Sequence, residues 1–285
     1  MLDVLKVILL GIVEGITEWL PVSSTGHMII LDELIKLNVS KEFLEVFLVV
    51  IQLGAILAVV ILFWNQIWPF GKKDNKEPLA KDGVGAFVKW DIFKLWFHIL
   101  VSCVPAAIVG LLFDEQLEAL FYNYQTVAIM LILFGIAFIV IENYHKGKKA
   151  KVTALDGIDY KLAFWIGMFQ LIAAIFPGTS RSGATIVGAL LLGVSRTVAA
   201  EYTFFLAIPV MFGASLLKGV KFLAGASMTS MEGAILAGGM VVAFVVSFFV
   251  IKFLLGYIKK HDFKVFGYYR IALGIIVILF FLIRG

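Results

Sequence analysis

Charged side chains are scarce in this chain: 15% of its 285 residues are Asp, Glu, Lys or Arg, whereas 61% are hydrophobic. Soluble domains carry about 25% charged residues, so a soluble globular domain is excluded. The hydrophobic excess recurs along the whole length, which predicts that the entire chain is a membrane domain. A single cysteine, Cys103, excludes an intramolecular disulfide and a Cys/His metal cluster. The formal net charge of +4 falls in short loops, so no nucleic-acid partner is expected.

Long apolar stretches, by contrast, are abundant. A membrane-spanning helix needs about 20 mostly apolar residues. Six stretches reach this length, and we expect one span in each: 43–64, 93–113, 124–142, 197–217, 232–256 and 265–284. The predicted fold class is therefore an all-α integral membrane protein with six transmembrane helices.

Two further apolar regions are interrupted by polar residues, proline and glycine. Residues 1–35 contain PVSSTGH at Pro21, and residues 161–193 contain PGTSRSG at Pro177. Each flanking piece is too short to cross a bilayer, and irregular backbone at membrane depth survives only where protein or a water-filled cavity covers it. Both regions are therefore predicted to be re-entrant helical hairpins.

The two interrupted regions also resemble one another. GIVEGITEWLPVSSTGH aligns without a gap on GMFQLIAAIFPGTSRSG, so that Pro21 matches Pro177 and Ser24 matches Ser180. Three predicted spans separate the copies, and an odd number of crossings inverts the second copy relative to the first. We therefore expect an inverted-topology repeat, an architecture whose sites lie near the bilayer midplane where the repeats meet.

Lysines concentrate in the loops after the first, third and fifth spans, whereas the loop 114–123 has three acidic residues and neither Lys nor Arg. The positive-inside rule then places the basic loops in the cytoplasm and 114–123 outside. The predicted organisation has three parts: repeat 1 over 1–142, a cytoplasmic linker over 143–160, and repeat 2 over 161–285.

The first interruption carries two acids. Glu14 and Glu18 are four residues apart, share a helical face, and sit in an apolar setting where ionisable groups are costly. Two carboxylates there suit a divalent cation, Mg²⁺ or Ca²⁺, or an arginine partner. The turn that follows adds hydroxyls and an imidazole, from Ser23, Ser24, Thr25 and His27. A helix start with free N–H groups binds anions.

The second interruption carries Arg181 within the apolar stretch 162–192. Its planar guanidinium suits phosphate. The residues around it that would complete an oxyanion cradle, through hydroxyl or backbone N–H groups, are Gly178, Thr179, Ser180, Ser182 and Thr185. Together the two copies have the inventory for phosphoryl transfer, which depends on positioning and charge stabilisation. The nucleophile stays open between His27, Ser24 and a metal-bound water.

EGITEWLPVSSTGH at Glu14 and PGTSRSGAT at Pro177 resemble the two motifs of the BacA-type undecaprenyl-diphosphate phosphatases, and VVIQLGAILAVVILFW at Val49 is similar to the stretch after the first motif. The resemblance implies hydrolysis of undecaprenyl diphosphate to undecaprenyl phosphate and inorganic phosphate. It also implies carrier recycling for cell-wall synthesis, bacitracin resistance, and a place in the bacterial inner (plasma) membrane, with the site open to the periplasmic or extracellular side.

The family's functional positions carry over onto Glu14, Glu18, Ser24, His27 and Arg181, with supporting positions at Ser23, Thr25, Gln52, Ser180 and Ser182. An alternative from another class is a polyprenyl-phosphate transporter or flippase, because inverted repeats with broken helices are typical of transporters. An anion transporter, however, has no evident need for two acids beside a histidine. The oligomeric state stays open, and a homodimer is compatible with the sequence.

Overall fold

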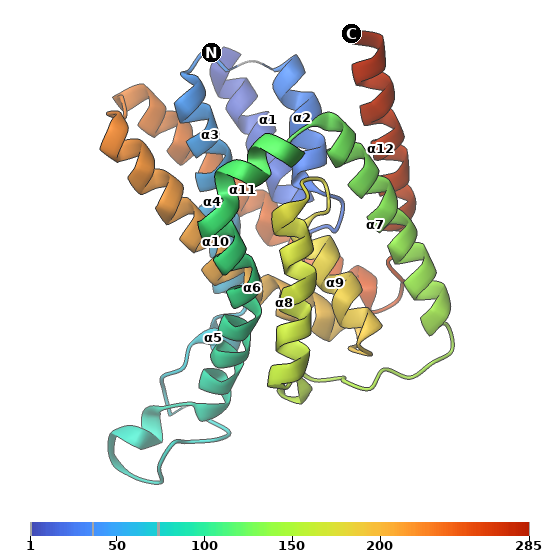
Figure 1. Ribbon diagram of the computed structural model, residues 1–285. Coiled ribbons are helices and arrows are strands. Elements are labelled where there is room, and N and C mark those ends of the chain that lie inside the picture. The colour runs from blue at the N-terminus through green and yellow to red at the C-terminus, as the bar shows by residue number, and fades with distance from the viewer. Residues whose placement is uncertain (1, 36, 73–74, 285) are drawn as a thin grey trace.

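The computed structural model describes residues 2–35, 37–72 and 75–284. Met1, Lys36, Lys73, Asp74 and Gly285, which fall within the predicted repeats, lie outside the described residues. The helices are α1 (Leu2–Thr17), α2 (Ser24–Leu34), α3 (Lys41–Val50), α4 (Gln52–Leu62), α5 (Trp64–Ile67), α6 (Trp90–Phe121), α7 (Tyr124–His145), α8 (Tyr160–Ile175), α9 (Arg181–Leu191), α10 (Arg196–Gly225), α11 (Ser230–Ile258) and α12 (Lys264–Arg284), with 3₁₀ turns at Gly83–Phe87 and Leu155–Gly157 (Figure 1).

Within the described residues, six helices are long and apolar enough to cross a membrane: Lys41–Leu62 (α3 with α4), α6, α7, α10, α11 and α12. Each corresponds to one predicted span, so the prediction of a multi-pass, all-helical membrane protein is confirmed. Several helices run beyond their apolar stretch; α6 has 32 residues and carries Asp114, Glu115 and Glu118 in its last turns. Charged turns extend a helix past the hydrocarbon layer, where backbone hydrogen bonding continues although the side chains become polar.

Both interrupted regions form a helix, an irregular turn and a second helix. The first arms, α1 and α8, have 16 residues each, and the second arms, α2 and α9, have 11 each. At about 1.5 Å per residue these arms measure about 24 and 16 Å, less than the roughly 30 Å of a hydrocarbon core. In Figure 1 the first unit lies beside the amino terminus and the second toward the opposite end of the bundle.

Helix packing brings the two turns into the interior of the bundle. α12 packs along α7, α6 along α8, and α1 along α11, while α9 packs against α8 and α10. Trp19 of the first turn is fully buried, and its ring meets Phe204 of α10 edge-on at 5.3 Å between centroids. Large apolar side chains on the outside, such as Leu111 and Leu112 of α6, remain exposed on the protein surface. This accounts for the hydrophobic excess of the sequence: apolar residues serve both the core and the surface.

Candidate functional site

The centre of the candidate site is Glu18, a buried residue just after the end of α1. Its Oε1 accepts a hydrogen bond from Arg181 Nη2 at 2.9 Å, and its Oε2 accepts one from Ser24 Oγ at 3.1 Å. The side chains of Arg181 and Glu18 are only 13% and 9% exposed, so this is a largely buried ion pair. The predicted convergence of Arg181 with the acids of the first turn is confirmed.

Ser24 and Arg181 occupy equivalent places, because each is the first residue of its helix. The preceding residues, Ser23 and Ser180, cap these helices by accepting from the N–H of Gly26 and Gly183, at 3.2 Å in both cases. Both caps have left-handed φ values, 74° and 67°, which non-glycine residues adopt only where the surroundings impose them.

The capping geometry corrects the sequence alignment by one residue. The ungapped match paired Ser24 with Ser180, whereas the structure pairs Ser23 with Ser180 and Ser24 with Arg181. The physical reason is turn length: five residues, 18–22, precede the first cap, and four residues, 176–179, precede the second. The correction shows why a hydroxyl and a guanidinium approach the same carboxylate: they project from the same position of two similar helix starts.

The other hydroxyls of the second turn hold the turn in place. Ser182 Oγ donates to the backbone oxygen of Glu18 at 3.0 Å and lies 3.1 Å from Ser180 Oγ. Thr185 Oγ1 donates to the backbone oxygen of Arg181 at 2.9 Å. Arg181 Nη1 donates to the backbone oxygen of Thr203 at 3.1 Å. Ser182 and Thr185, predicted to bind substrate, are buried, and their hydroxyls bond to protein groups in this arrangement.

Gly178 and Thr179 form the floor of the second turn. Gly178 has φ 88°, and a Cβ at this position would collide with the backbone of Val127. Thr179 is fully buried, and its hydroxyl has no hydrogen-bond partner. Both residues therefore lie in the predicted turn, with the glycine required by its backbone conformation and by its contact with α7.

His27 does not join the Glu18 cluster. Its Nδ1 lies 2.7 Å from the backbone oxygen of Ser23, and its Nε2 lies 2.7 Å from the hydroxyl of Tyr269 in α12. A carbonyl oxygen only accepts, which assigns the proton to Nδ1; Nε2 of the neutral ring then accepts from Tyr269. Attack by His27 on phosphorus through Nε2 would require this hydrogen bond to break, whereas Ser24 already contacts a carboxylate.

Glu14 lies one turn before Glu18 and is 2% exposed. The Gln52 side chain hydrogen-bonds to it, and its Oε1 has no partner. Across the described residues no group of three or more His, Cys, Asp or Glu side chains is placed to hold a metal. The metal ligands available are the carboxylates of Glu14 and Glu18, and Oε1 of Glu14 has no hydrogen-bond partner. This ligand set fits Mg²⁺, which proteins hold through one or two carboxylates while water and substrate phosphates complete the shell.

A cavity of about 520 Å³ lies beside the start of α2 and the second turn. Thr25 of α2 and Pro177 of the second turn line it, together with the last turns of α6. Its ionisable lining comprises Asp32, Lys41, Glu45, Asp114, Glu118 and Lys218. The cavity thus connects the region of the candidate site with the face of the protein on which residues 114–122 lie.

The sequence reasoning missed two neighbouring residues of α12. Tyr269 contacts His27, and Arg270, fully buried, donates hydrogen bonds to backbone oxygens of both turns. One signal was available: an arginine inside the predicted span 265–284 is costly in a membrane and by default marks a functional or structural site. Its partners could not be read from the sequence because they are backbone carbonyls.

The fold and this cluster define a multi-pass membrane protein with a buried polar site, in which a hydroxyl, a carboxylate and a guanidinium from two broken-helix units meet. A hydroxyl within reach of a base that a third group orients is the general arrangement for activating an oxygen nucleophile. The chain belongs to the family described as "Bacitracin resistance protein BacA", whose profile matches residues 7–276.

Relatives with curated names are similar over nearly their whole length. A protein of Desulfitobacterium hafniense named "Undecaprenyl-diphosphatase" is 65% identical over 284 residues, 100% of this chain and 98% of the relative. "Undecaprenyl-diphosphatase 1" of Clostridium acetobutylicum is 61% identical over 99% of this chain and 98% of its own. An "Undecaprenyl-diphosphatase" of Enterococcus faecalis is 59% identical over 98% and 97%.

Proposed function

We propose that this protein is an integral membrane phosphatase that hydrolyses undecaprenyl diphosphate to undecaprenyl phosphate and inorganic phosphate. The observation that carries the proposal is the hydroxyl–carboxylate–guanidinium arrangement of Ser24, Glu18 and Arg181. The names of relatives at 59–65% identity support the same substrate. The reaction returns the lipid carrier to cell-wall synthesis and lowers the amount of diphosphate available to bacitracin, which accounts for resistance.

Ser24 is the proposed nucleophile. Its Oγ attacks the terminal phosphorus while Glu18 takes the hydroxyl proton, and the bond between that phosphorus and the bridging oxygen breaks. Glu18 then gives the proton to the departing undecaprenyl phosphate. In the second half Glu18 takes a proton from a water molecule that attacks the phosphoserine, and it returns this proton to Ser24 as inorganic phosphate leaves. The first proton transfer uses the contact already present between Ser24 Oγ and Glu18 Oε2, at 3.1 Å.

Arg181 is the proposed electrostatic partner of the transferred phosphoryl group. Its guanidinium is anchored through one nitrogen to the backbone oxygen of Thr203 and through the other to Glu18. The starts of α2 and α9 add oriented N–H groups, with the positive ends of their helix dipoles, close to the same point. Preorganised donors of this kind stabilise developing charge without reorganisation during the reaction.

A divalent cation, Mg²⁺ or Ca²⁺, is the proposed cofactor, held by Glu14 and Glu18 together with the diphosphate. When bound, it would neutralise phosphate charge. The support is the orphaned, buried Oε1 of Glu14, which in a membrane interior needs a partner. The Gln52 side chain hydrogen-bonds to Glu14 and orients it, so Gln52 acts on the cofactor site rather than on the substrate.

The architecture proposed around this site is an inverted-topology repeat. Repeat 1 over 1–142 and repeat 2 over 161–285 each contain a re-entrant hairpin and three spans, and a cytoplasmic linker over 143–160 joins them. The support for the repeat is the equal length of corresponding arms and the shared capping geometry of Ser23 and Ser180. The site opens to the periplasmic or extracellular side, and the support is that the cavity beside the start of α2 and the second turn reaches the end of α6, where the loop 114–123 has neither Lys nor Arg.

The decisive experiment measures phosphate release from undecaprenyl diphosphate by the protein purified in detergent, with Ser24→Ala as the control. Hydrolysis needs no sealed compartment, whereas transport does. Release by the wild type and loss in Ser24→Ala is the expected result. An inactive wild type that instead moves polyprenyl phosphate across a liposome membrane would favour the flippase alternative, whose support is the same broken-helix repeat.

A further inference from the structure

We propose that Arg270 is a positioning residue that fixes the two turns relative to each other and thereby sets the geometry of Ser24, Glu18 and Arg181. The proposal rests on the phosphatase function, because its effect is expected in the rate of that reaction. Arg270 lies in α12, outside both sequence motifs, and has no exposed surface.

The guanidinium of Arg270 touches both turns at once. Nη1 donates to the backbone oxygen of Pro21 at 3.2 Å, in the first turn. Nη2 donates to the backbone oxygens of Gly178 at 2.9 Å and Thr179 at 2.7 Å, in the second turn. Contacts with α7 are longer: backbone oxygens of the helix lie at 3.4 Å from Nη2 and from Nε. The shortest bonds of Arg270 are therefore those to the turns.

The charge of Arg270 is balanced by carbonyl dipoles and by the ring of Phe134, whose centroid lies 5.8 Å from Cζ. No ion pair among the described residues includes Arg270. A buried cation without a carboxylate partner is costly. A neutral hydrogen-bond donor would therefore be the less costly residue at this position if one or two hydrogen bonds to the turns were enough. Arginine offers five N–H donors in a rigid fork, and lysine offers a point charge with rotatable donors. The fork shape matches the requirement to bind backbone oxygens from three segments at once: the first turn, the second turn and α7.

The bonds to the second turn also orient its peptide groups. In a trans peptide the C=O and N–H point in opposite directions, and the described residues contain no cis peptide. A Thr179 carbonyl bound to Arg270 therefore directs the N–H of Ser180 away from Arg270. Ser180 is the residue with the left-handed φ of 67° that caps α9. Arg270 thus helps to impose the strained cap from which Arg181 projects toward Glu18.

Gly183 shows how closely this arrangement is packed. A Cβ added at Gly183 would lie 2.8 Å from Arg270 Nη1, which is the nitrogen that binds Pro21. An alanine there would displace the fork while leaving every donor and charge in place. The same Cβ would lie 3.2 Å from Ser180 Cβ, so Gly183→Ala perturbs both Arg270 and the cap that Arg270 helps to impose. It provides a second variant that keeps the arginine.

The test compares kcat and KM for Arg270→Lys and Gly183→Ala, each per amount of folded, monodisperse protein in detergent. Misplacement of catalytic groups by about 1 Å costs about 10²-fold in rate, so we expect kcat to fall by about 10- to 100-fold in each. KM should stay within about 3-fold, because interactions lost only in the transition state lower kcat and kcat/KM equally. A residue that only stabilised the fold would lower the yield or melting temperature and leave kcat unchanged.

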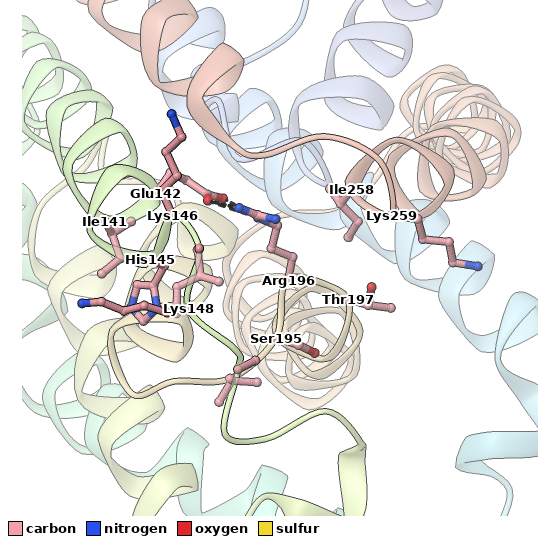
Figure 2. Close-up of a pocket in the computed structure, with 14 residues that line it drawn as sticks. Ile141, Glu142, His145, Lys146, Lys148, Ser195, Arg196, Thr197, Ile258 and Lys259 are labelled. Carbon is pink, nitrogen blue, oxygen red and sulfur yellow. Dashed lines mark hydrogen bonds and ion pairs between the residues drawn. The ribbon is translucent and has the colours of Figure 1, made fainter.

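The matched control is Arg196→Lys. Arg196 binds both carboxylate oxygens of Glu142, which also accepts from the backbone N–H of Phe263 at 2.9 Å. This arginine likewise ties helix ends together, at a cavity of about 510 Å³ outside the candidate site. Figure 2 shows the Arg196 side chain directed at Glu142, with the ammonium group of Lys259 projecting away from the pair. Its loss should lower stability and leave kcat unchanged.

Wild-type kcat in folded Arg270→Lys overturns the inference, as does wild-type kcat in Gly183→Ala if the lysine variant does not fold. A loss of kcat in Arg196→Lys as large as in Arg270→Lys would also overturn it, because any helix-anchoring arginine would then have the same effect. If instead the wild type and Arg196→Lys both release no phosphate, the proposed function fails, which is distinguishable from a failure of the positioning role.

Discussion

Arg181→Lys keeps the positive charge of the candidate site and removes the planar, two-nitrogen geometry of the guanidinium. The guanidinium uses two nitrogens, one on Glu18 at 2.9 Å and one on the backbone oxygen of Thr203 at 3.1 Å. A lysine ammonium is a single point of charge and cannot hold both contacts while presenting a planar pair of donors to a phosphoryl group. We therefore expect a folded protein that is nearly inactive.

The magnitude follows from what is lost. Removing one preorganised donor to a developing oxyanion costs about 10²–10³-fold in kcat, or about 2.7–4 kcal/mol, and Arg181→Lys should reach at least the lower figure. Arg181→Met should be worse in a second way. It leaves the Glu18 carboxylate buried without its cation, a change that costs about 3–5 kcal/mol of stability in buried pairs. The lysine variant therefore separates the catalytic effect from the effect on folding.

The assay is phosphate release from undecaprenyl diphosphate by purified protein in detergent, with folded protein quantified by circular dichroism and size-exclusion chromatography. Arg284→Lys is the matched control. The same chemical change is made there at an exposed pair with Glu33, whose side chains are 49% and 40% exposed and 3.6 Å apart. Exposed pairs contribute about 0–1 kcal/mol, so this variant should retain nearly full activity.

A purified Arg181→Lys protein that releases phosphate at the wild-type rate would refute the reasoning. It would mean that charge alone is sufficient at this position and that the observed bidentate anchoring serves the fold. An Arg181→Lys protein with a normal kcat and a raised KM would also contradict it, because uniform binding rather than transition-state stabilisation would then have been lost.

Three further predictions concern the cofactor, the nucleophile and the membrane topology. Exhaustive chelation should abolish phosphate release, added Mg²⁺ or Ca²⁺ should restore it, and Glu14→Gln should raise the metal concentration needed for half-maximal rate; a rate untouched by chelation would remove the metal from the site. Because Ser24 rather than His27 contacts the carboxylate, Ser24→Ala should lose about 10³-fold or more in kcat and His27→Gln clearly less. Single-turnover kinetics measures both losses, and a larger loss in His27→Gln would contradict the assignment of Ser24 as nucleophile. With the native cysteine replaced, an impermeant thiol reagent should label Asn123→Cys but not Lys76→Cys in intact cells; the opposite pattern would invert the topology and move the opening of the site to the cytoplasm.

The helical segments were predictable because their signal is local. A run of apolar residues of sufficient length defines a span whatever its neighbours are. Five of the six predicted spans lie within helices of the structure, and the sixth, 43–64, overlaps Lys41–Leu62. The two interruptions were equally visible, since Pro21 and Pro177 break apolar runs that are otherwise continuous. The cost of placing Glu14, Glu18 and Arg181 in lipid also predicted that such residues must gather.

The pairing of particular atoms was not predictable in this way. The one-residue error in matching Ser24 with Ser180 arose because turn length, unlike composition, depends on how the backbone closes between helices. His27 was expected beside the acids, and only the packing of α12 against α2 turns it toward Tyr269. No sequence pattern distinguishes these alternatives, because an imidazole can form its hydrogen bonds with the acids or with a tyrosine hydroxyl and a backbone oxygen.

The sequence by itself thus determined that this protein spans the membrane with helices, breaks two of its apolar regions, and puts acids, hydroxyls and an arginine in the breaks. The tertiary structure decided that Arg181, 163 positions from Glu18 in the chain, and Ser24, 6 positions from it, both bind the Glu18 carboxylate. It also decided that Arg270 joins both turns through their backbone carbonyl groups. The physical reason is that hydrophobicity acts through short windows of sequence, whereas hydrogen bonds of about 3 Å between distant segments exist only after helices have packed in one register.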